Sequence, residues 1–271
     1  MSLNSPQSII DTPKMVIDIQ TINAFVICLK RKPVSHDNMQ SWKAVFPNTH
    51  IYEAVDGNNI DIENDERVHA LARMHITCRN SVANDSIFSV PTRGAIGCFL
   101  SHHSLLNWSI DHNKPIVIIE QDALFTKECH EVLPKAFTKI PKDAEYVSLL
   151  YIAQAHSRPH NQYFKRLVGP QCDGNQCYYI TPSGARKIMK HSMPIVTQFD
   201  LLIGIVAHTD ETFKGYVLNT RLYSMWRVLK DNMGSSIQNF AVKKYLPRSN
   251  VFYYGTIMLL LLLILYALHT I

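Results

Sequence analysis

Two carboxylates stand at the end of an unbroken apolar run, and this is where a ligand site is expected. Residues 116–119 (IVII) are followed by Glu120, Gln121 and Asp122. Such a run is typical of a strand buried on both faces, and open α/β sheets bind ligands at the carboxyl ends of their strands. On an extended strand Glu120 and Asp122 face the same side, and their oxygen atoms suit Mn²⁺ or Mg²⁺. The spacing predicts a metal site at this pair, with solvated residues capping a strand as the alternative.

A third carboxylate, Asp200, directly precedes a second apolar segment, residues 201–203. A carboxylate at the edge of a buried segment is either the N-cap of a helix or a functional group. As a functional group it would take a proton as a general base, or it would contact the metal or the acceptor. Asp200 is the candidate catalytic residue, and the helix cap stays open as the alternative.

Strand and helix patterns alternate along most of the chain and must position these carboxylates. The segments with strand character are residues 24–29, 49–53, 116–119, 146–151 and 177–180. Those with helical spacing are residues 37–46, 65–78, 93–112, 128–140 and 182–190. Thr181 and Pro182 form the start signal of the last of these helices. Residues 55–59 are predicted to turn, and residues 157–173 to be a polar insertion. The alternation predicts an α/β fold with a mostly parallel sheet.

Composition limits the class of protein and of partner. The 271 residues are 46% hydrophobic and 18% charged, which is enough for one large folded domain. A net charge of +5, without a dense basic run before Lys243, argues against nucleic acid and favours an anionic small molecule or a membrane surface. The scattered cysteines are expected to be structural thiols. Cys28 and Cys98 should fill the core, and Cys172 with Cys177 would pair only in an oxidising compartment.

Residues 251–268 carry no charge and are long enough to cross a bilayer as a helix. Lys243, Lys244 and Arg248 precede this run, which favours a cytoplasmic amino-terminal domain, and residues 1–13 lack the pattern of a signal peptide. The expected location is therefore the membrane, with a single C-terminal anchor. The predicted organisation is a polar extension at 1–22, a catalytic domain at 23–230, a basic juxtamembrane linker at 231–250 and a transmembrane anchor at 251–271.

Six segments in order resemble a known family. They read FVICLKR, AVDG, GAIGCFLSHHSLLNW, IVIIEQDALF, CYYITPSGARKIM and QFDLLI, within residues 24–223. This order is similar to family 25 glycosyltransferases, which include lipooligosaccharide and procollagen galactosyltransferases. The resemblance implies a glycosyltransferase-A-like fold with a mostly parallel Rossmann-like sheet and flanking helices. It also implies a UDP-sugar donor, inversion at the anomeric carbon and a role like that in lipopolysaccharide biosynthesis. Mn²⁺ or Mg²⁺ held by the carboxylates would neutralise the negative charge that grows on the diphosphate of such a donor.

The resemblance adds candidates for binding the donor, each with a structural alternative. Basic side chains would meet phosphate or uracil, an aspartate in the AVDG turn would meet ribose, and a Ser-His pair matches that of the family. These residues are Lys30, Arg31, Asp56, Arg93, Ser101 and His102. Solvated basic side chains, local hydrogen bonding in a turn and a buried structural histidine are the corresponding alternatives. Phe199 and Asp200 stand where the family has a Pro-Val-Asp-like motif.

Two departures from the family pattern keep a second function open. The family usually has Glu-Asp-Asp where this chain has Glu120-Gln121-Asp122, and it carries a further Arg that residues 33–36 do not supply. The first hypothesis is an inverting enzyme that moves a hexose, galactose by resemblance, from a UDP-sugar to a hydroxyl of a glycan or glycoprotein. The alternative is a catalytically silent relative that binds a sugar or a partner and is recruited to the membrane.

Overall fold

The computed structural model describes residues 17–77, 90, 92–123, 125–150, 156–169 and 175–219. All of them belong to the first of the two units into which the chain divides, Met1–Met233. The predicted membrane span at 251–268 and Cys172 lie outside these residues, as does almost all of the polar stretch 80–90. Among the residues described, none of the helices has the length and apolar character needed to span a membrane.

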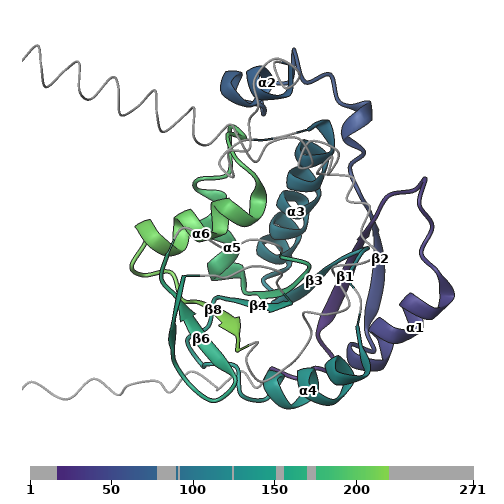
Figure 1. The fold of residues 1–271 in the computed structure, drawn as a ribbon, viewed down its shortest axis with the longest axis vertical. Helices are drawn as coiled ribbons and strands as arrows, with labels where there is room; N and C mark the ends of the chain where they lie inside the picture. The colour runs from purple at the N-terminus through teal and green to yellow at the C-terminus, as the bar shows by residue number, and fades with distance from the viewer. Residues whose placement is uncertain are drawn as a thin grey trace, which may run out of the picture. The chain divides into compact units, whose positions relative to one another are not determined.

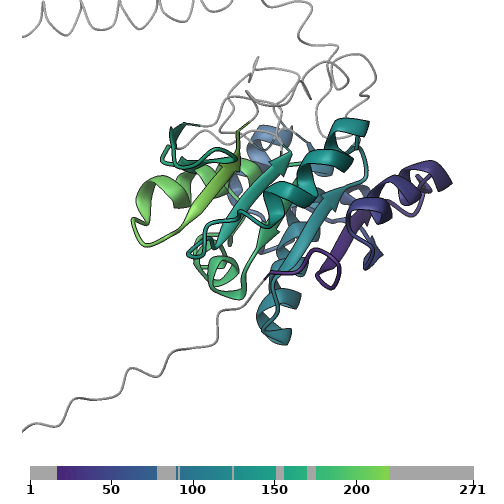
Figure 2. The same cartoon turned by 90° about the horizontal axis from the view of Figure 1, so that it is seen from below.

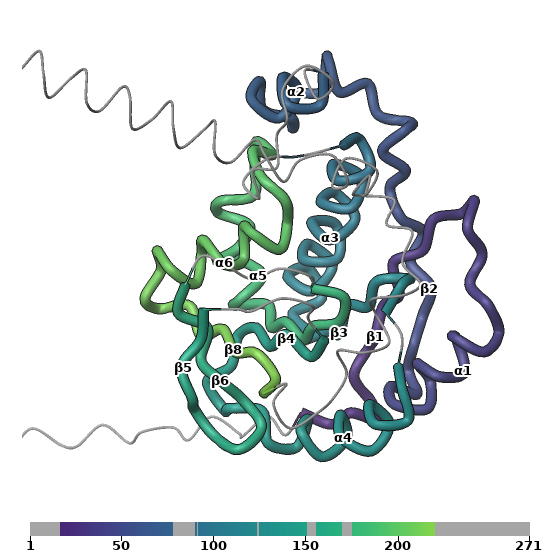
Figure 3. The backbone as a smooth tube through the Cα atoms, in the orientation of Figure 1, coloured from purple at the N-terminus to yellow at the C-terminus, as the bar shows by residue number. Residues whose placement is uncertain are grey.

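Eight strands form one sheet, in the order β2-β1-β3-β7-β4-β8-β6-β5 (Figure 1). Their bounds are Asn23–Cys28 (β1), Thr49–Glu53 (β2), Ile116–Glu120 (β3), Tyr146–Leu150 (β4), Ser157–Pro159 (β5), Phe164–Leu167 (β6), Cys177–Ile180 (β7) and Gly215–Leu218 (β8). The five predicted strands are confirmed. β8 and the β5–β6 hairpin were not predicted, and the hairpin lies inside the expected polar insertion (Figure 3).

The sheet is mixed, so the expectation of a mostly parallel sheet is wrong. β1 pairs in parallel with β2 and β3, and β4 pairs in parallel with β8. β7 lies antiparallel between β3 and β4, and β6 lies antiparallel to both β5 and β8. The chain between β3 and β4 skips one position in the sheet, which β7 fills in the opposite direction. An apolar run predicts a buried strand but not its direction, because both directions bury the same side chains.

Helices cover both faces of this sheet (Figures 1 and 2). Their bounds are His36–Val45 (α1), Ala70–Thr77 (α2), Arg93–His112 (α3), Lys127–Phe137 (α4), Pro182–Met189 (α5) and Phe199–Thr209 (α6), with a 3-10 turn at Gly57–Asn59 (η1). α1 and α4 lie on one side, and α3, α5 and α6 on the other. The helix predicted at 93–112 is confirmed, and Thr181 caps α5 as expected, its hydroxyl accepting from Gly184 N at 3.1 Å.

The core beneath α1 reaches the loop that follows β3. Trp42 is fully buried between this helix and the sheet, next to Phe46 and Val26. Its indole Nε1 donates to the carbonyl oxygen of Ala123 at 2.9 Å. Because Ala123 follows Asp122 directly, the hydrogen bond from Trp42 fixes the backbone next to the predicted metal site.

The segment after β2 packs against α3 through two glycines. A Cβ atom added to Gly57 would lie 1.8 Å from the carbonyl oxygen of Arg93, and one added to Gly97 would lie 2.4 Å from that of Val55. No side chain fits at either distance, so the two backbones meet only because these residues are glycines. Between them, Val55 N donates to the hydroxyl of Ser101 at 2.9 Å.

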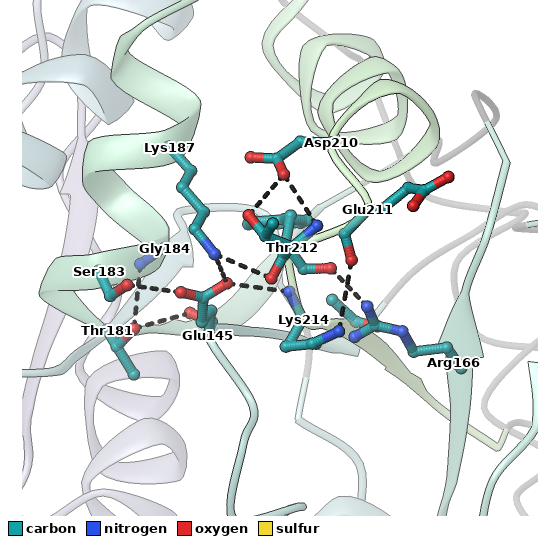
Figure 4. A network of polar contacts seen from close by, with 12 residues as sticks. Glu145, Arg166, Thr181, Ser183, Gly184, Lys187, Asp210, Glu211, Thr212 and Lys214 are labelled. Atoms are coloured by element: carbon teal, nitrogen blue, oxygen red, sulfur yellow. Dashed lines mark hydrogen bonds and ion pairs between the residues drawn. The ribbon is translucent and has the colours of Figure 1, made fainter.

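A polar network ties α5 to β4 and to the chain entering β8 (Figure 4). The carboxylate of Glu145 accepts from Lys187 Nζ at 2.8 Å, from the backbone N of Lys214 at 2.9 Å and from the hydroxyl of Ser183. Lys187 Nζ also donates to the carbonyl oxygen of Thr212 at 2.8 Å. Glu145 immediately precedes β4, so this network holds the amino end of that strand, whereas the predicted site follows the carboxyl end of β3.

Candidate functional site

Glu120 ends β3 beside Ile27 of β1 and turns its carboxylate toward α3. One carboxylate oxygen lies 3.1 Å from Nε2 of His102 and 3.9 Å from Sγ of Cys98. Cys98 and His102 are four residues apart on α3 and therefore share one face of the helix. Cys98, predicted to be a core residue, instead lies half-buried at the site.

His102 is buried, and its surroundings fix the plane of its ring. Nδ1 lies 2.9 Å from the hydroxyl of Tyr178 on β7, and the ring stacks on Phe199 with centroids 4.5 Å apart. Burial lowers the pKa of His102 to about 3, so the ring is neutral at physiological pH. A Tyr178 hydroxyl that donates to Nδ1 leaves the ring proton on Nε2, where it donates to Glu120. His102 thereby orients the carboxylate without forming an ion pair.

The three predicted carboxylates influence one another electrostatically. Burial, followed by the charge of Asp200, raises the pKa of Glu120 to about 8. Burial, followed by the charge of Glu120, raises the pKa of Asp122 to about 7, and Lys32 opposes this shift. Asp122 is exposed to solvent, which screens the effect there more than at half-buried Glu120. The structure therefore brings Glu120, Asp122 and Asp200 into one electrostatic cluster.

Asp200 is not the cap of its helix. The N-cap of α6 is Gln198, and Asp200 stands in the first turn, where its Oδ1 accepts from the backbone N of Leu201 at 2.9 Å. The helix-cap alternative is therefore wrong. A carboxylate in the first turn nevertheless interacts favourably with the positive end of the helix dipole. Its neighbour Phe199 packs on His102 of α3 and lies near Tyr178 of β7, so α6 brings Asp200 toward the site beside these two elements.

The donor atoms present suit a hard divalent cation. Of the residues described, Cys98, His102 and Glu120 offer one ligand atom each within 4.8 Å of one another. Burial and the surrounding carboxylates raise the pKa of the Cys98 thiol well above its ordinary value, which keeps it a neutral thiol and a poor ligand. Asp122 is not part of this group of three, and its pairing with Glu120 as a metal-binding set stays a prediction that rests on the oxygen chemistry of the two carboxylates. This donor set fits Mn²⁺ or Mg²⁺.

Two of the predicted donor-binding residues form an ion pair next to this cluster. Arg31 Nε lies 2.7 Å from Oδ2 of Asp56, while Oδ1 of Asp56 accepts from Asn58 N at 3.1 Å and so caps η1. The Arg31 guanidinium, about half exposed, holds the pKa of Asp56 below its ordinary value. Lys30 is exposed beside them. Binding of a donor by these residues stays a prediction.

Ser101 and Arg93, also predicted to meet the donor, make contacts with the backbone. The Ser101 hydroxyl donates to the carbonyl of Gly97 at 2.7 Å and accepts from Val55, and Ser101 is fully buried. Arg93 Nη1 donates to the carbonyl of Ile60 at 2.8 Å. Both therefore hold the segment after β2 against α3, and of the two only Arg93 is exposed to solvent.

Sequence reasoning treated Gln121 only as a missing acid and did not predict its contacts. Its Oε1 accepts from the backbone N of Leu29 at 3.2 Å, and its Nε2 donates to the carbonyl of Lys32. Tyr178 and Phe199, which orient His102, were predicted only as parts of a strand and a motif. No local signal identifies these partners, because Leu29 and Gln121 are 92 positions apart.

The mixed α/β fold, with carboxylates at the carboxyl end of a central strand, is consistent with a glycosyltransferase. The family model described as Glycosyltransferase family 25 (LPS biosynthesis protein) matches residues 21–203. The chain therefore belongs to glycosyltransferase family 25, which supports a transferase activity and implies a nucleotide-sugar donor and a glycan acceptor. Comparison with curated proteins gives no match.

Proposed function

We propose that this protein is an inverting, metal-dependent hexosyltransferase with a glycosyltransferase-A-like fold. It moves a hexose, galactose by resemblance, from a UDP-sugar to a hydroxyl of a glycan or glycoprotein. The observation that supports this most directly is the convergence of Glu120, Asp122 and Asp200 at the end of β3 in a family 25 chain. Each of these charges contributes to raising the pKa of the Cys98 thiol, so all three carboxylates act electrostatically on the same side chain.

Glu120 and Asp122 would hold Mn²⁺ or Mg²⁺. When bound, the cation neutralises the negative charge that builds up on the diphosphate as the sugar leaves. His102 keeps one Glu120 oxygen turned toward α3, and the Tyr178 hydroxyl keeps the imidazole in place. Outer contacts of this kind orient a ligand and fix its protonation state.

Asp200 would act as the base on the acceptor. In an inverting transfer the acceptor oxygen forms a bond to the anomeric carbon while the bond from that carbon to the phosphate oxygen breaks. The nucleoside diphosphate leaves with the electron pair, and the hydroxyl proton passes to a carboxylate. Asp200 is half-buried and approaches from α6, whereas Arg31 and Asp56 lie toward β1 and β2. The donor would therefore enter from the side of the Arg31–Asp56 pair and the acceptor from the side of α6.

The test is Asp122→Asn, with Asp111→Asn at the exposed end of α3 as a matched control. We expect Asp122→Asn to abolish release of UDP from UDP-sugars in Mn²⁺ and to weaken donor binding, while the control behaves like the wild type. Full turnover in EDTA, or an active Asp122→Asn protein, would contradict the metal assignment. A wild-type protein that binds a UDP-sugar yet neither transfers nor hydrolyses it would instead be the silent relative.

Membrane attachment through residues 251–268 is a separate part of the proposal, based on their uninterrupted apolar character. The intact chain is expected to sediment with membranes and to resist extraction with alkaline carbonate. Recovery in a high-speed supernatant would contradict it. Protection of the catalytic domain from protease in sealed vesicles would contradict the cytoplasmic orientation.

A further inference from the structure

Gln121 binds both ends of the short loop that follows β1. This loop, residues 29–32, closes on itself through a hydrogen bond from Lys32 N to the carbonyl of Leu29 at 2.8 Å. The Gln121 side chain accepts from Leu29 N at 3.2 Å and donates to the carbonyl of Lys32. A primary amide provides an acceptor and a donor at once, and here both are used on backbone atoms of the same loop.

A carboxylate cannot make this pair of contacts. Glutamate at position 121 would still accept from Leu29 N, but its second oxygen would face the carbonyl of Lys32 with no proton between them. Aspartate is one methylene shorter and would not reach both atoms. The amide is therefore matched to the loop, and its presence between Glu120 and Asp122 has a local physical reason.

The loop is held from two directions. Gln121 binds its backbone from the end of β3, and Asp56 binds the side chain of Arg31 at 2.7 Å from the start of η1. The loop also carries Lys30 and Lys32, and the charge of Lys32 acts on Asp122. The loop therefore presents three cationic side chains close to two carboxylates. A nucleotide diphosphate with a bound divalent cation would be attracted to both, because its phosphates are negative and its metal is positive.

We propose that Gln121 is a positioning residue that holds the 29–32 loop against the carboxylate site, so that the basic side chains of the loop meet the diphosphate of the nucleotide sugar. This inference rests on the proposed function. It assigns Gln121 no contact with the reacting atoms. Replacing Gln121 should change donor binding, whereas Glu120 and Asp122 are the proposed metal ligands.

The experiment compares Gln121→Glu and Gln121→Met in the full-length chain. The control is Gln162→Glu, an exposed position in the turn between β5 and β6 that introduces the same charge. Loss of one intramolecular hydrogen bond costs about 0.5–1.5 kcal/mol, so we expect the KM for UDP-sugar to rise about 2- to 12-fold in Gln121→Glu and further in Gln121→Met, which loses both bonds. The kcat at saturating donor and the KM for acceptor should change much less, and the control should match the wild type.

For Gln121→Asp, the family pattern and the contacts seen in the structure predict opposite results. The family pattern taken alone favours retained or increased activity when the acid is restored, whereas the contacts of Gln121 predict weaker donor binding. Wild-type donor affinity in Gln121→Glu, Gln121→Met or Gln121→Asp would overturn the positioning role. So would failure of both the Glu and Met variants to fold, since Gln121 would then be a general structural residue. Failure of the proposed function is distinct, because it would appear as absence of turnover in the wild type.

Discussion

Nε2 of His102 lies 3.1 Å from a carboxylate oxygen of Glu120, and this contact joins the middle of α3 to the end of β3. On its other side the imidazole meets the hydroxyl of Tyr178, so a single line of polar groups runs from β7 through α3 to the site. The neutral ring donates to Glu120 without cancelling its charge. The carboxylate charges are therefore balanced by protonation or by a cation in the proposed metal site.

Removing this contact should weaken metal binding more than it weakens the fold. His102→Phe keeps a ring to stack on Phe199 but leaves Glu120 without its donor. Loss of an outer contact of this type typically costs about 10- to 100-fold in metal affinity or activity, and we expect that range. The measurement is the Mn²⁺ concentration that gives half-maximal release of UDP. A change in thermal stability with unchanged Mn²⁺ dependence would assign His102 a packing role only.

The raised pKa of Glu120 predicts an unusual dependence of stability on pH. In the folded, metal-free protein this group binds its proton up to about pH 8, whereas its ordinary pKa is 4.5. The folded state then holds more protons than the unfolded state between these values. Stability from this group is fully present below pH 4.5 and is lost as pH rises through about 8.

The measurement is the melting temperature across this pH range in EDTA, for the wild type and for Glu120→Gln. The variant does not titrate at this position, so the stability of the wild type should fall relative to it as pH rises. Added Mn²⁺ should reverse the loss most strongly at the high end, because the metal binds the ionised carboxylate. Parallel curves for the two proteins would show that Glu120 titrates near its ordinary pKa.

Asp200→Asn should separate proton transfer from donor binding. As a base Asp200 acts only on the acceptor, so transfer should fall about 10²-fold or more while UDP-sugar affinity stays near that of the wild type. The control is Glu211→Gln, an exposed carboxylate just beyond the other end of α6. A parallel loss of donor affinity, partly restored by excess Mn²⁺, would make Asp200 a metal ligand instead.

Lys187→Met should destabilise the fold without affecting the site. It leaves the carboxylate of Glu145, which is only 12% exposed, without its cationic partner. An incompletely satisfied, largely buried group costs about 1–3 kcal/mol, and we expect a loss of that size in the free energy of unfolding by denaturant. Lys190→Met, exposed at the end of the same helix, should change it little. A raised KM for donor in Lys187→Met would show that the two ends of the sheet are coupled.

Gly97→Ala should disrupt the contact between α3 and the segment after β2. The added methyl group would lie 2.4 Å from the carbonyl of Val55, and rigid backbone cannot move away cheaply. Overpacking of this kind costs about 1–3 kcal/mol, measured as a fall in the free energy of unfolding. Asn107→Ala, on the same helix but only half-buried, is the control. A stable Gly97→Ala protein with normal activity would contradict the close packing.

Local pattern predicted five of the eight described strands and most of the described helices, and it placed Glu120 at the end of a strand. The apolar run at 116–119 gave a buried strand, the spacing of 93–112 gave α3 to the residue, and Thr181 with Pro182 gave the start of α5. These predictions hold because periodicity, caps and turn residues act within a few positions of the chain. The carboxylates at the end of β3 follow from the same local reading.

Strand direction and the shortest strands were not predictable in this way. β5, β6 and β8, of three or four residues each, were not predicted, and β7 joins the sheet against its neighbours. Pairing between strands depends on backbone hydrogen bonds to partners far along the chain. Sequence pattern therefore predicted the members of the sheet better than their order or direction.

The sequence by itself determined which carboxylates the protein presents and on which elements they stand. Only the tertiary structure decided what surrounds them. In the folded protein, Cys98 and His102 contact Glu120, and the charge of Asp200 on α6 acts on the same carboxylate. The amide of Gln121 binds the backbone of the 29–32 loop. The physical reason is that protonation, orientation and hydrogen bonding depend on distances of a few ångström between residues up to 92 positions apart, which no local pattern encodes.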